Sequence, residues 1–240
     1  MADNRLIVAI GGGTFQFPVG EDGRLDAYLL TISRERSGQD RPRICYVPTA
    51  AADAAATLDD FYAAFGSVAD ASHLALFERT VADVDAFLLA QDLVFIAGGN
   101  TVNMLAIWRQ HGVDRALLAA WQAGVAMSGV SAGGICWFEG FTTDSFGPEL
   151  RAVRDGFGVL SGSFVPHYHG EAQRRPLFHR LVADGTLPPG YGVDDGAALM
   201  FRGTELVEAV SAMDGAGVFR VESVDGAAVE TALPIRRLAG

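Results

Sequence analysis

The sequence lacks several features that would assign a chain quickly to a class of protein. Among its 240 residues it has only two cysteines, Cys45 and Cys136. Both lie in apolar segments, and their wide spacing offers neither a disulfide framework nor the ligand spacing of a zinc site. We therefore expect two buried thiols, as in a protein from a reducing compartment.

Basic residues are also scarce, and no apolar run is long. Lys and Arg total 18 against 29 Asp and Glu, which gives a formal net charge of −11. Phosphate backbones and anionic membranes attract clustered basic side chains, so we expect neither a nucleic acid nor a membrane as partner. The apolar run near the N-terminus is too short for a signal peptide, and no window approaches the ~20 apolar residues of a membrane span. The sequence predicts a cytoplasmic, soluble protein.

Apolar residues and glycine are abundant instead: 50% of the chain is hydrophobic, and 29 residues are glycine. Continuous apolar runs predict strands that are covered on both faces. They lie at residues 6–10, 44–47, 74–77, 93–97 and 124–130. Helix-length segments alternate with them, at 24–37, 51–67, 103–111 and 113–123. This alternation predicts an α/β fold with a mainly parallel sheet flanked by helices.

The character of the sequence changes after Asp144, where it becomes polar and rich in glycine. We expect short strands there and one helix near residues 172–183. The segments GTELVEAV (203–210) and GAGVFRVES (215–223) resemble an antiparallel meander, with Asp-Gly turn residues at 214–215 and 225–226. No linker or repeat separates the two halves. We expect one domain, 1–240, with an antiparallel C-terminal extension.

The stretch AMSGVSAGG places Ser131 within a Gly-x-Ser-x-Gly motif, between Gly129 and Gly133. A predicted strand precedes this serine and a predicted helix begins near Ala132, which is the context of a nucleophile elbow. Small neighbours suit a tight turn, and the Ala132 amide would point at an oxyanion. The alternative is a cramped turn with no catalytic role, since the motif arises by chance in a glycine-rich chain.

A serine nucleophile needs a base, and the chain has five histidines. We expect His73 at the start of a strand, His111 at a helix end and His179 within a helix. His167 and His169 follow an apolar strand, so either can reach the carboxyl end of the sheet, where ligands of α/β folds collect. Both would face the same side if the strand continued. His167 is the better candidate because it is nearer the strand end; a surface histidine is the alternative.

An acid must orient the base, and two adjacent carboxylates, Asp194 and Asp195, follow a strand-like segment. Adjacent residues alternate faces, so only one of the two can face the site. An ordinary Asp-Asp-Gly turn is the alternative. Asp144, which follows Ser131 in sequence, is a third acid that could approach the site.

The segment AGGNT (97–101) also ends a predicted strand and opens a predicted helix. Its glycines allow close backbone approach, so the Gly99 amide could be a second oxyanion donor, with Asn100 lining the pocket. Helix capping is the alternative. The segment GGGTF (11–15) has the same position after the first strand. Neither segment contains a dinucleotide-binding or P-loop signature.

Four segments together resemble a known family. They are GGNTVNMLAIWRQHG, SGVSAGGICWFEGFTTDS, VPHYHGE and DDGAALMF, in this order along the chain. In these segments the sequence is similar to the peptidase E group of serine peptidases, the S51 aspartyl dipeptidases, which are relatives of cyanophycinase. The resemblance implies a flavodoxin-like fold related to class I glutamine amidotransferases. It also implies a Ser–His–acid triad without metal or other cofactor, and cleavage of small peptides after an N-terminal aspartate.

Carried over by position, the resemblance implies that Ser131 is the nucleophile and His167 the base. Asp195 stands where cyanophycinase-like members carry a glutamate. This side chain is one methylene shorter, so Asp194 stays an alternative acid. Asp144 matches an aspartate that some descriptions of the family treat as the triad acid, although we favour a pocket role for it.

The resemblance also implies that Gly99 and Asn100 form the oxyanion and substrate-contact segment. An aspartyl substrate needs a cation, and a guanidinium suits a carboxylate. The nearest candidates in sequence follow His167: Arg174, Arg175 and Arg180.

Other functions stay open at this point: a serine esterase, a peptidase of other specificity, or a non-catalytic binding domain. Cys136 lies too far beyond the motif to replace Ser131, as cysteine does in related amidotransferases. The expected partner is a small peptide substrate, and self-association into a homo-oligomer stays open.

Overall fold

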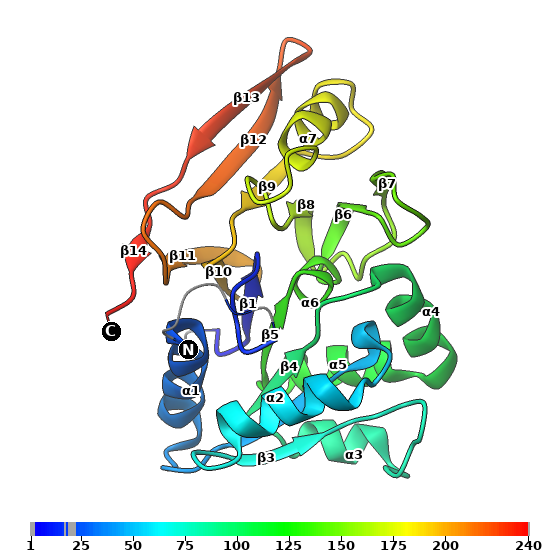
Figure 1. Cartoon of the computed structure of the whole chain (residues 1–240), viewed down its shortest axis with the longest axis vertical. Coiled ribbons are helices and arrows are strands. Elements are labelled where there is room, and N and C mark those ends of the chain that lie inside the picture. The colour runs from blue at the N-terminus through cyan, green and yellow to red at the C-terminus, as the bar shows by residue number, and fades with distance from the viewer. Residues whose placement is uncertain (1–2, 17, 19–22, 240) are drawn as a thin grey trace.

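The strands of the chain form two β-sheets, one above the other in Figure 1. The structure, a computed structural model, describes residues 3–16, 18 and 23–239. The larger sheet has eight strands in the order β14-β11-β10-β1-β5-β4-β2-β3, and the smaller has six in the order β13-β12-β9-β8-β6-β7. Ser131 follows a strand of the larger sheet and His167 follows a strand of the smaller one, so both sheets contribute candidate site residues.

The larger sheet has a parallel centre. Its five parallel strands are β1 (Leu6–Ile10), β2 (Arg43–Val47), β3 (Asp70–His73), β4 (Leu93–Ile96) and β5 (Ala126–Val130). The antiparallel strand β10 (Ala197–Arg202) pairs with β1, and β11 (Glu205–Ser211) and β14 (Arg236–Arg237) complete that edge. The predicted mainly parallel sheet is confirmed.

The smaller sheet is mixed. Its strands are β6 (Phe138–Thr143), β7 (Arg151–Val153), β8 (Leu160–Val165), β9 (Gly190–Val193), β12 (Val218–Val224) and β13 (Ala227–Ala232). Strands β6, β8 and β9 run parallel, and the others pair antiparallel. Asp225 and Gly226 both have positive φ, so the predicted Asp-Gly turn between β12 and β13 is present.

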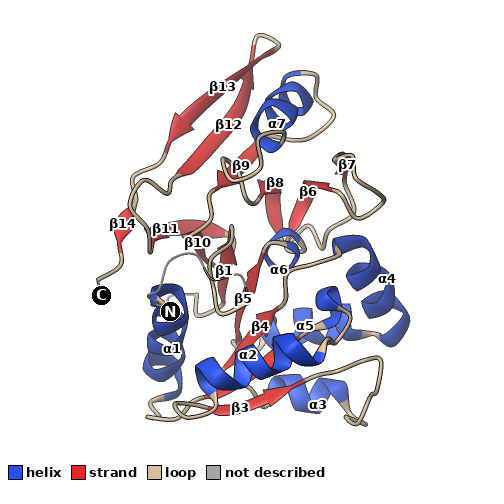
Figure 2. Cartoon of the chain, viewed as in Figure 1, coloured by secondary structure: helices blue, strands red, loops and turns tan. Residues whose placement is uncertain are grey.

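Helices flank the larger sheet, and one lies against the smaller (Figure 2). They are α1 (Arg24–Ser37), the 3₁₀ turn η1 (Thr49–Ala51), α2 (Ala55–Phe65), α3 (Val84–Leu89), α4 (Thr101–His111), α5 (Val113–Gln122), α6 (Ala132–Ile135) and α7 (Arg174–Ala183). The sequence explains several ends. Asn100 caps α4 by accepting from the Asn103 N–H, and Gly38 ends α1 with a positive φ.

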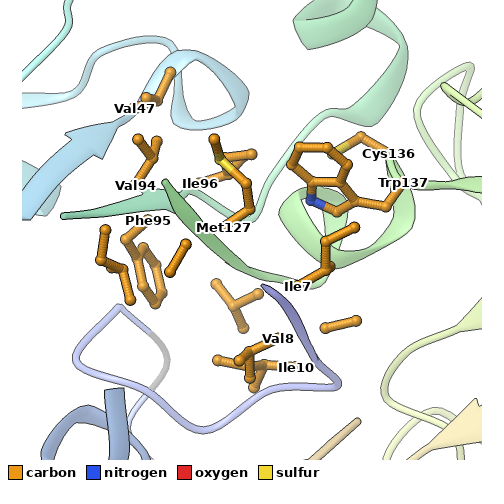
Figure 3. Close-up of a cluster of buried hydrophobic side chains, with 14 of the residues drawn as sticks. Ile7, Val8, Ile10, Val47, Val94, Phe95, Ile96, Met127, Cys136 and Trp137 are labelled. Atoms are coloured by element: carbon orange, nitrogen blue, oxygen red, sulfur yellow. The ribbon is translucent and has the colours of Figure 1, made fainter. Parts of the chain in front are cut away.

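The core lies on both faces of the parallel strands, as continuous apolar runs predict. All five residues of β1 are at most 5% exposed. Figure 3 shows the two layers of side chains that strand alternation produces: Val8, Ile10 and Phe95 on one side, and Ile7, Val94, Ile96 and Met127 on the other. Two packed faces hold these strands rigidly, so the loops at their carboxyl ends start from fixed points.

At the far edge of this sheet, one strand prediction is wrong. The apolar run 74–77 is not a strand: β3 comprises the preceding residues, Asp70–His73, so His73 ends a strand and does not begin one. Leu76 and Phe77 donate their N–H groups to the Asp53 carboxylate, at 2.5 and 2.9 Å, and so cannot continue a β-ladder. The sequence reading also missed α3, which Asp83 caps.

The predicted antiparallel meander near the C-terminus is also wrong. The segment 203–210 contributes to β11 in the larger sheet, whereas 215–223 contributes to β12 in the smaller one. The chain crosses between the sheets after Ser211, because β11 pairs with β10 while β12 pairs with β9. Within the described residues, no helix is long and apolar enough to cross a membrane.

Candidate active site

Ser131 lies at a sharp turn between β5 and α6. Its φ of 51° and ψ of −110° are a sparsely populated backbone conformation for a residue with a side chain. The turn is fixed on one side by the Ser131 N–H, which donates to the Ile10 carbonyl at 2.9 Å, and on the other by the Ile135 N–H, which donates to the Ser131 carbonyl at 2.8 Å. Ser131 as a residue is partly exposed to solvent.

The glycines of the motif are required by the close packing of this turn. A Cβ at Gly129 would overlap the backbone of Gly133, and a Cβ at Gly133 would overlap the Ile96 carbonyl oxygen of β4. The helix therefore approaches two neighbouring strands more closely than any side chain allows. This is the physical reason for the small residues around Ser131.

His167 and Asp195 form a hydrogen-bonded pair. The His167 Nδ1 lies 2.5 Å from the Asp195 Oδ1, and the side chains are 18% and 31% exposed. His167 follows β8, and Asp195 lies where the chain passes from β9 in the smaller sheet to β10 in the larger. The positive φ of His167, 50°, turns the chain sharply. An acid in this position orients an imidazole and stabilises its charged form.

Asp194, the alternative acid, is occupied elsewhere. Its carboxylate accepts from the backbone N–H of His169 at 3.0 Å, from the His169 Nδ1 at 2.9 Å and from the Gly217 N–H at 2.9 Å. His167 and His169 therefore pair with different carboxylates. Strand alternation, which would put both on the same side if the strand continued, does not apply to them, because β8 ends at Val165 and His167 turns the chain with a positive φ.

Gly12 connects this pair to the strand beside Ser131. It follows β1, the parallel neighbour of β5, and forms an isolated β-bridge with Asp195. A Cβ at Gly12 would overlap the Asp195 carboxylate and lie 3.1 Å from the His167 Cε1. The imidazole therefore lies at the end of the strand adjacent to the one that carries Ser131.

The segment Gly98–Asn100 lies at the carboxyl end of β4, on the other side of β5. Gly99 is exposed, has a φ of 136°, and a Cβ there would overlap the Ala50 carbonyl. Among the residues that the structure describes, its N–H has no protein acceptor. Ala132 is the first residue of α6, so its N–H lies outside the hydrogen bonds of that helix.

Asn100 and Asp144 belong to the same corner of the site. The Asn100 side chain caps α4 through its Oδ1, and its Nδ2 donates to the Ser145 carbonyl at 3.2 Å. Asp144 precedes Ser145 and is exposed. The loop after β6 therefore adjoins the segment that carries Gly99, whereas the carboxylate on the His167 Nδ1 is that of Asp195.

The three candidate arginines lie in different surroundings. Arg174 is 4% exposed, pairs with both carboxylate oxygens of Glu171, and directs its Nη1 toward the Thr142 carbonyl at 3.5 Å. Glu171 in turn donates its N–H to the His167 carbonyl at 2.9 Å. Arg175 pairs with Glu230 of β13, and Arg180 is exposed near the end of α7. Of these three arginines, Arg174 is the one that is linked, through Glu171, to the turn that carries His167.

The two cysteines are free and buried, as predicted. Burial raises the pKa of the Cys136 thiol well above its usual value, and its Sγ donates to the Gly133 carbonyl at 3.2 Å. It is therefore not a thiolate nucleophile. Within the described ranges, no group of three or more His, Cys, Asp or Glu side chains is placed to hold a metal ion.

Sequence reasoning missed two residues that hold this region together. Gln16 bonds to both backbone groups of Gly98, and Glu171 links Arg174 to His167. The partner of Gln16 lies 82 positions away, so no local pattern could have revealed it. Glu171 stands three residues before Arg174, a spacing that could have suggested an ion pair.

Comparisons with known proteins agree with this fold. Residues 7–209 match the profile of peptidase family S51. The chain is 41% identical over 235 residues to YgaJ, an uncharacterized peptidase of Bacillus subtilis strain 168, and the match covers 98% of this chain and 99% of that one.

Two solved structures are similar at 16% identity, which shows the fold alone. One is a peptidase from an acI-B1 actinobacterium, with a TM-score of 0.69, covering 96% of this chain and 94% of that one. The other is a putative peptidase E protein from Listeria monocytogenes EGD-e, with a TM-score of 0.60, covering 85% of this chain and 96% of that one.

Proposed function

The chain belongs to peptidase family S51, and on that premise we propose that it is a serine peptidase acting on small peptides through Ser131, His167 and Asp195. The observation that carries the proposal is the 2.5 Å contact between the His167 Nδ1 and Asp195, at the end of the strand beside Ser131. An imidazole oriented by an acid and a strained, partly exposed serine, at the ends of two neighbouring strands, supply the base and the nucleophile that acyl transfer requires.

The first half of the reaction forms an acyl-enzyme. Asp195 accepts a hydrogen bond from the His167 Nδ1–H, and the Nε2 of the imidazole takes the proton of the Ser131 hydroxyl. The Oγ then attacks the scissile carbonyl, and the N–H groups of Gly99 and Ala132 donate to the developing oxyanion. When the C–N bond breaks, the Nε2 returns that proton to the leaving amine.

The second half releases the acid. Water enters, His167 takes one of its protons, and the hydroxide attacks the ester on Ser131. Collapse of the second tetrahedral intermediate breaks the ester bond and returns the proton from His167 to the Ser131 oxygen. The enzyme is then restored, with no net change at the histidine or the acid.

The finer proposal is a dipeptidase that prefers N-terminal aspartate, with Arg174 receiving the substrate's side-chain carboxylate. It is supported by the burial of this guanidinium and by its link to the His167 turn through Glu171. Arg175 is engaged by Glu230, and Arg180 is exposed, so both are weaker candidates. Asp144, exposed beside the Asn100 segment, is available for the substrate's ammonium group.

One observation favours a peptidase of different specificity. Glu171 already engages Arg174 through two hydrogen bonds, so the guanidinium has its charge balanced before any substrate binds. A substrate carboxylate would have to share or displace this partner. Preference for aspartate therefore has to be measured separately from peptidase activity.

The test of the reaction uses Asp-Leu, Leu-Leu and a p-nitrophenyl ester as substrates. We expect peptide hydrolysis by the wild type, none by Ser131→Ala, and wild-type rates for Ser223→Ala, which removes an exposed hydroxyl of β12. A fluorophosphonate should label Ser131, and His167→Ala should abolish this labelling. Turnover of the ester alone, or peptide hydrolysis by Ser131→Ala, would overturn the proposal.

The test of specificity is the ratio of kcat/KM for Asp-Leu to that for Asn-Leu. Because both substrates are measured on one preparation, the ratio does not depend on the fraction of folded enzyme. In Arg174→Lys, loss of the bidentate fork should lower the ratio by about 10-fold, whereas Arg180→Ala should keep it. A wild-type ratio near one would favour the broader specificity.

A further inference from the structure

Gln16 pairs with both backbone groups of one glycine in the loop after β4. Its Nε2 donates to the Gly98 carbonyl at 2.9 Å, and its Oε1 accepts from the Gly98 N–H at 2.8 Å. A side-chain amide has one donor side and one acceptor side, so this reciprocal pair fixes both the position and the tilt of the Gly98 peptide groups. The contact is partly buried, which strengthens it relative to a bond in water.

This pair completes the restraint of the loop that carries Gly99. The Ala97 N–H donates to the Val47 carbonyl at 3.1 Å, and the Asn100 N–H donates to the Ala50 carbonyl at 2.9 Å. With Gly98 held by Gln16, three anchored residues flank Gly99: Ala97 and Gly98 before it and Asn100 after it. Within the described part of the chain that N–H has no acceptor of its own, so the anchors aim it without occupying it.

The segment that carries Gln16 also touches the acid–base pair at its other end. Gly12 forms the β-bridge with Asp195 and accepts the Gly196 N–H at 2.8 Å. Only a few residues separate Gly12 from Gln16, so this one loop after β1 contacts the oxyanion segment at one end and the acid at the other.

We propose that Gln16 is a positioning residue that holds the Gly99 N–H in the geometry needed for the oxyanion of the transition state. This inference rests on the proposed function and deepens it. Gln16 acts through Gly98 and touches neither the substrate nor the reacting atoms. The inference does not depend on which peptide is cleaved, because an oxyanion forms in every acyl transfer of this kind.

Chemistry makes glutamine specific for this task. Glutamate has the same shape, but as a carboxylate it only accepts, so one of its oxygens would face the Gly98 carbonyl oxygen. The peptide group would have to turn to avoid this repulsion, and the Gly99 N–H would turn with it. Alanine removes both bonds and leaves the loop with two anchors.

The experiment compares Gln16→Glu and Gln16→Ala with the wild type, and uses Gln39→Glu as a matched control. Gln39 is exposed in the loop before β2, so it receives the same chemical change away from the site. Titration with a fluorophosphonate gives the fraction of active enzyme, and kcat is expressed per active site. The variants are also measured with an alkyl boronic acid, whose tetrahedral adduct on serine carries an oxygen where the oxyanion forms.

We expect kcat per active site to fall by about 10–100-fold in both Gln16 variants, since removal of a whole oxyanion donor costs about 10²–10³-fold. KM should change by less than about twofold, because the Gly99 N–H stabilises the charged oxyanion of the transition state more than the neutral carbonyl of the bound substrate. Affinity for the boronic acid should fall by the same factor as kcat/KM. Gln39→Glu should match the wild type in every measurement.

A merely structural role for Gln16 would give a different result: a lower active fraction, with unchanged kcat and boronic acid affinity per active site. That outcome would overturn the inference. So would a changed pH dependence in Gln16→Ala, since the His167–Asp195 pair is left in place. Failure of the proposed function is distinct from either, because it would show as peptide hydrolysis by Ser131→Ala.

Discussion

Tyr168 donates its hydroxyl to the Glu230 carboxylate at 2.6 Å, which joins the turn of His167 to the β12–β13 hairpin. Tyr168 is fully buried and directly follows the candidate base. The same carboxylate contacts the His179 Nε2 at 2.8 Å and pairs with Arg175. Glu230 lies beyond residue 209, where the family match ends. A segment beyond the residues that match the family profile thus supports the turn that carries the imidazole.

Replacement of Glu230 by glutamine should destabilise the protein. The amide keeps one acceptor for Tyr168 but loses the charge that Arg175 and His179 face, so we expect the free energy of unfolding to fall by about 2–3 kcal/mol. Urea unfolding at pH 7 measures this. Glu222→Gln is the control, because that exposed carboxylate lies 3.6 Å from Arg220 and should change little.

The same carboxylate should make the stability of the protein sensitive to acid. Burial alone would raise the pKa of Glu230, but hydrogen bonds from Arg175, Tyr168 and His179 lower it from 4.5 to about 2. A lowered pKa gives stability that is present above pH 4.5 and is lost as the pH falls toward 2. The difference in unfolding free energy between wild type and Glu230→Gln should shrink across that window; a constant difference would contradict the assignment.

The two adjacent aspartates should respond differently to the same change. Asp195→Asn should lower kcat by about 10³–10⁴-fold with little effect on stability, because it removes the acid that orients His167. Asp194→Asn should mainly lower stability, since Asp194 is 7% exposed and holds His169 and Gly217. Kinetics per active site and thermal unfolding separate the two effects. Equal kinetic losses in both variants would contradict distinct roles.

Substitution at Gly133 should damage the turn at Ser131. In Gly133→Ala the new methyl group would overlap the Ile96 carbonyl, which forces α6 away from β4 and should cost about 1–3 kcal/mol of stability together with most of the activity. Gly185→Ala is the comparison. Gly185 has a φ of 76° but open space around it, so only the backbone penalty of about 1 kcal/mol applies. Thermal unfolding and peptide hydrolysis report the two outcomes.

Asp26, in the first turn of α1, should make the protein less stable as the pH rises. Burial raises the pKa of its carboxyl from 3.8 to about 7, against the opposing effect of the Phe15 backbone N–H. The protonated acid is favoured in the folded state, so stability falls as the pH increases from 3.8 to about 7 and then levels off. Asp26→Asn should therefore equal the wild type in stability near pH 4 and exceed it at pH 8 by a few kcal/mol, because the wild type loses about 1.4 kcal/mol for each pH unit within that window. Urea unfolding at the two pH values measures this, and an equal advantage at both would contradict the prediction.

The strands and helices with the strongest patterns could be predicted from sequence. β1 and α1 have the predicted bounds, because β1 is a continuous apolar run that ends at glycine and α1 is a helix-length segment between Gly23 and Gly38. The prediction of a strand at Leu74–Phe77 is wrong because the backbone there is engaged by a residue far away in the sequence. Leu74 and Leu76 are buried there without a β-ladder, and Phe77 is exposed, since the Asp53 carboxylate takes the Leu76 and Phe77 N–H groups that pairing would need.

The site residues divide in a similar way. Ser131 could be found locally because the elbow is built from adjacent small residues, whose tight packing is a property of the motif itself. The choice between Asp194 and Asp195 could not be made from the sequence, because both are aspartates and they are adjacent in the chain. The turn at His167, with its positive φ, decided it by directing His167 and His169 to different carboxylates.

The sequence by itself determined the parallel α/β sheet, the strained turn at Ser131 and the set of residues from which an acid–base pair could be drawn. Only the tertiary structure decided which acid meets His167, and that Gln16 and Glu230 hold the segments around it. Hydrophobic periodicity and glycine spacing are local, so they can be read along the chain. A hydrogen bond between residues many positions apart depends on where two strands end in space, which no local pattern records.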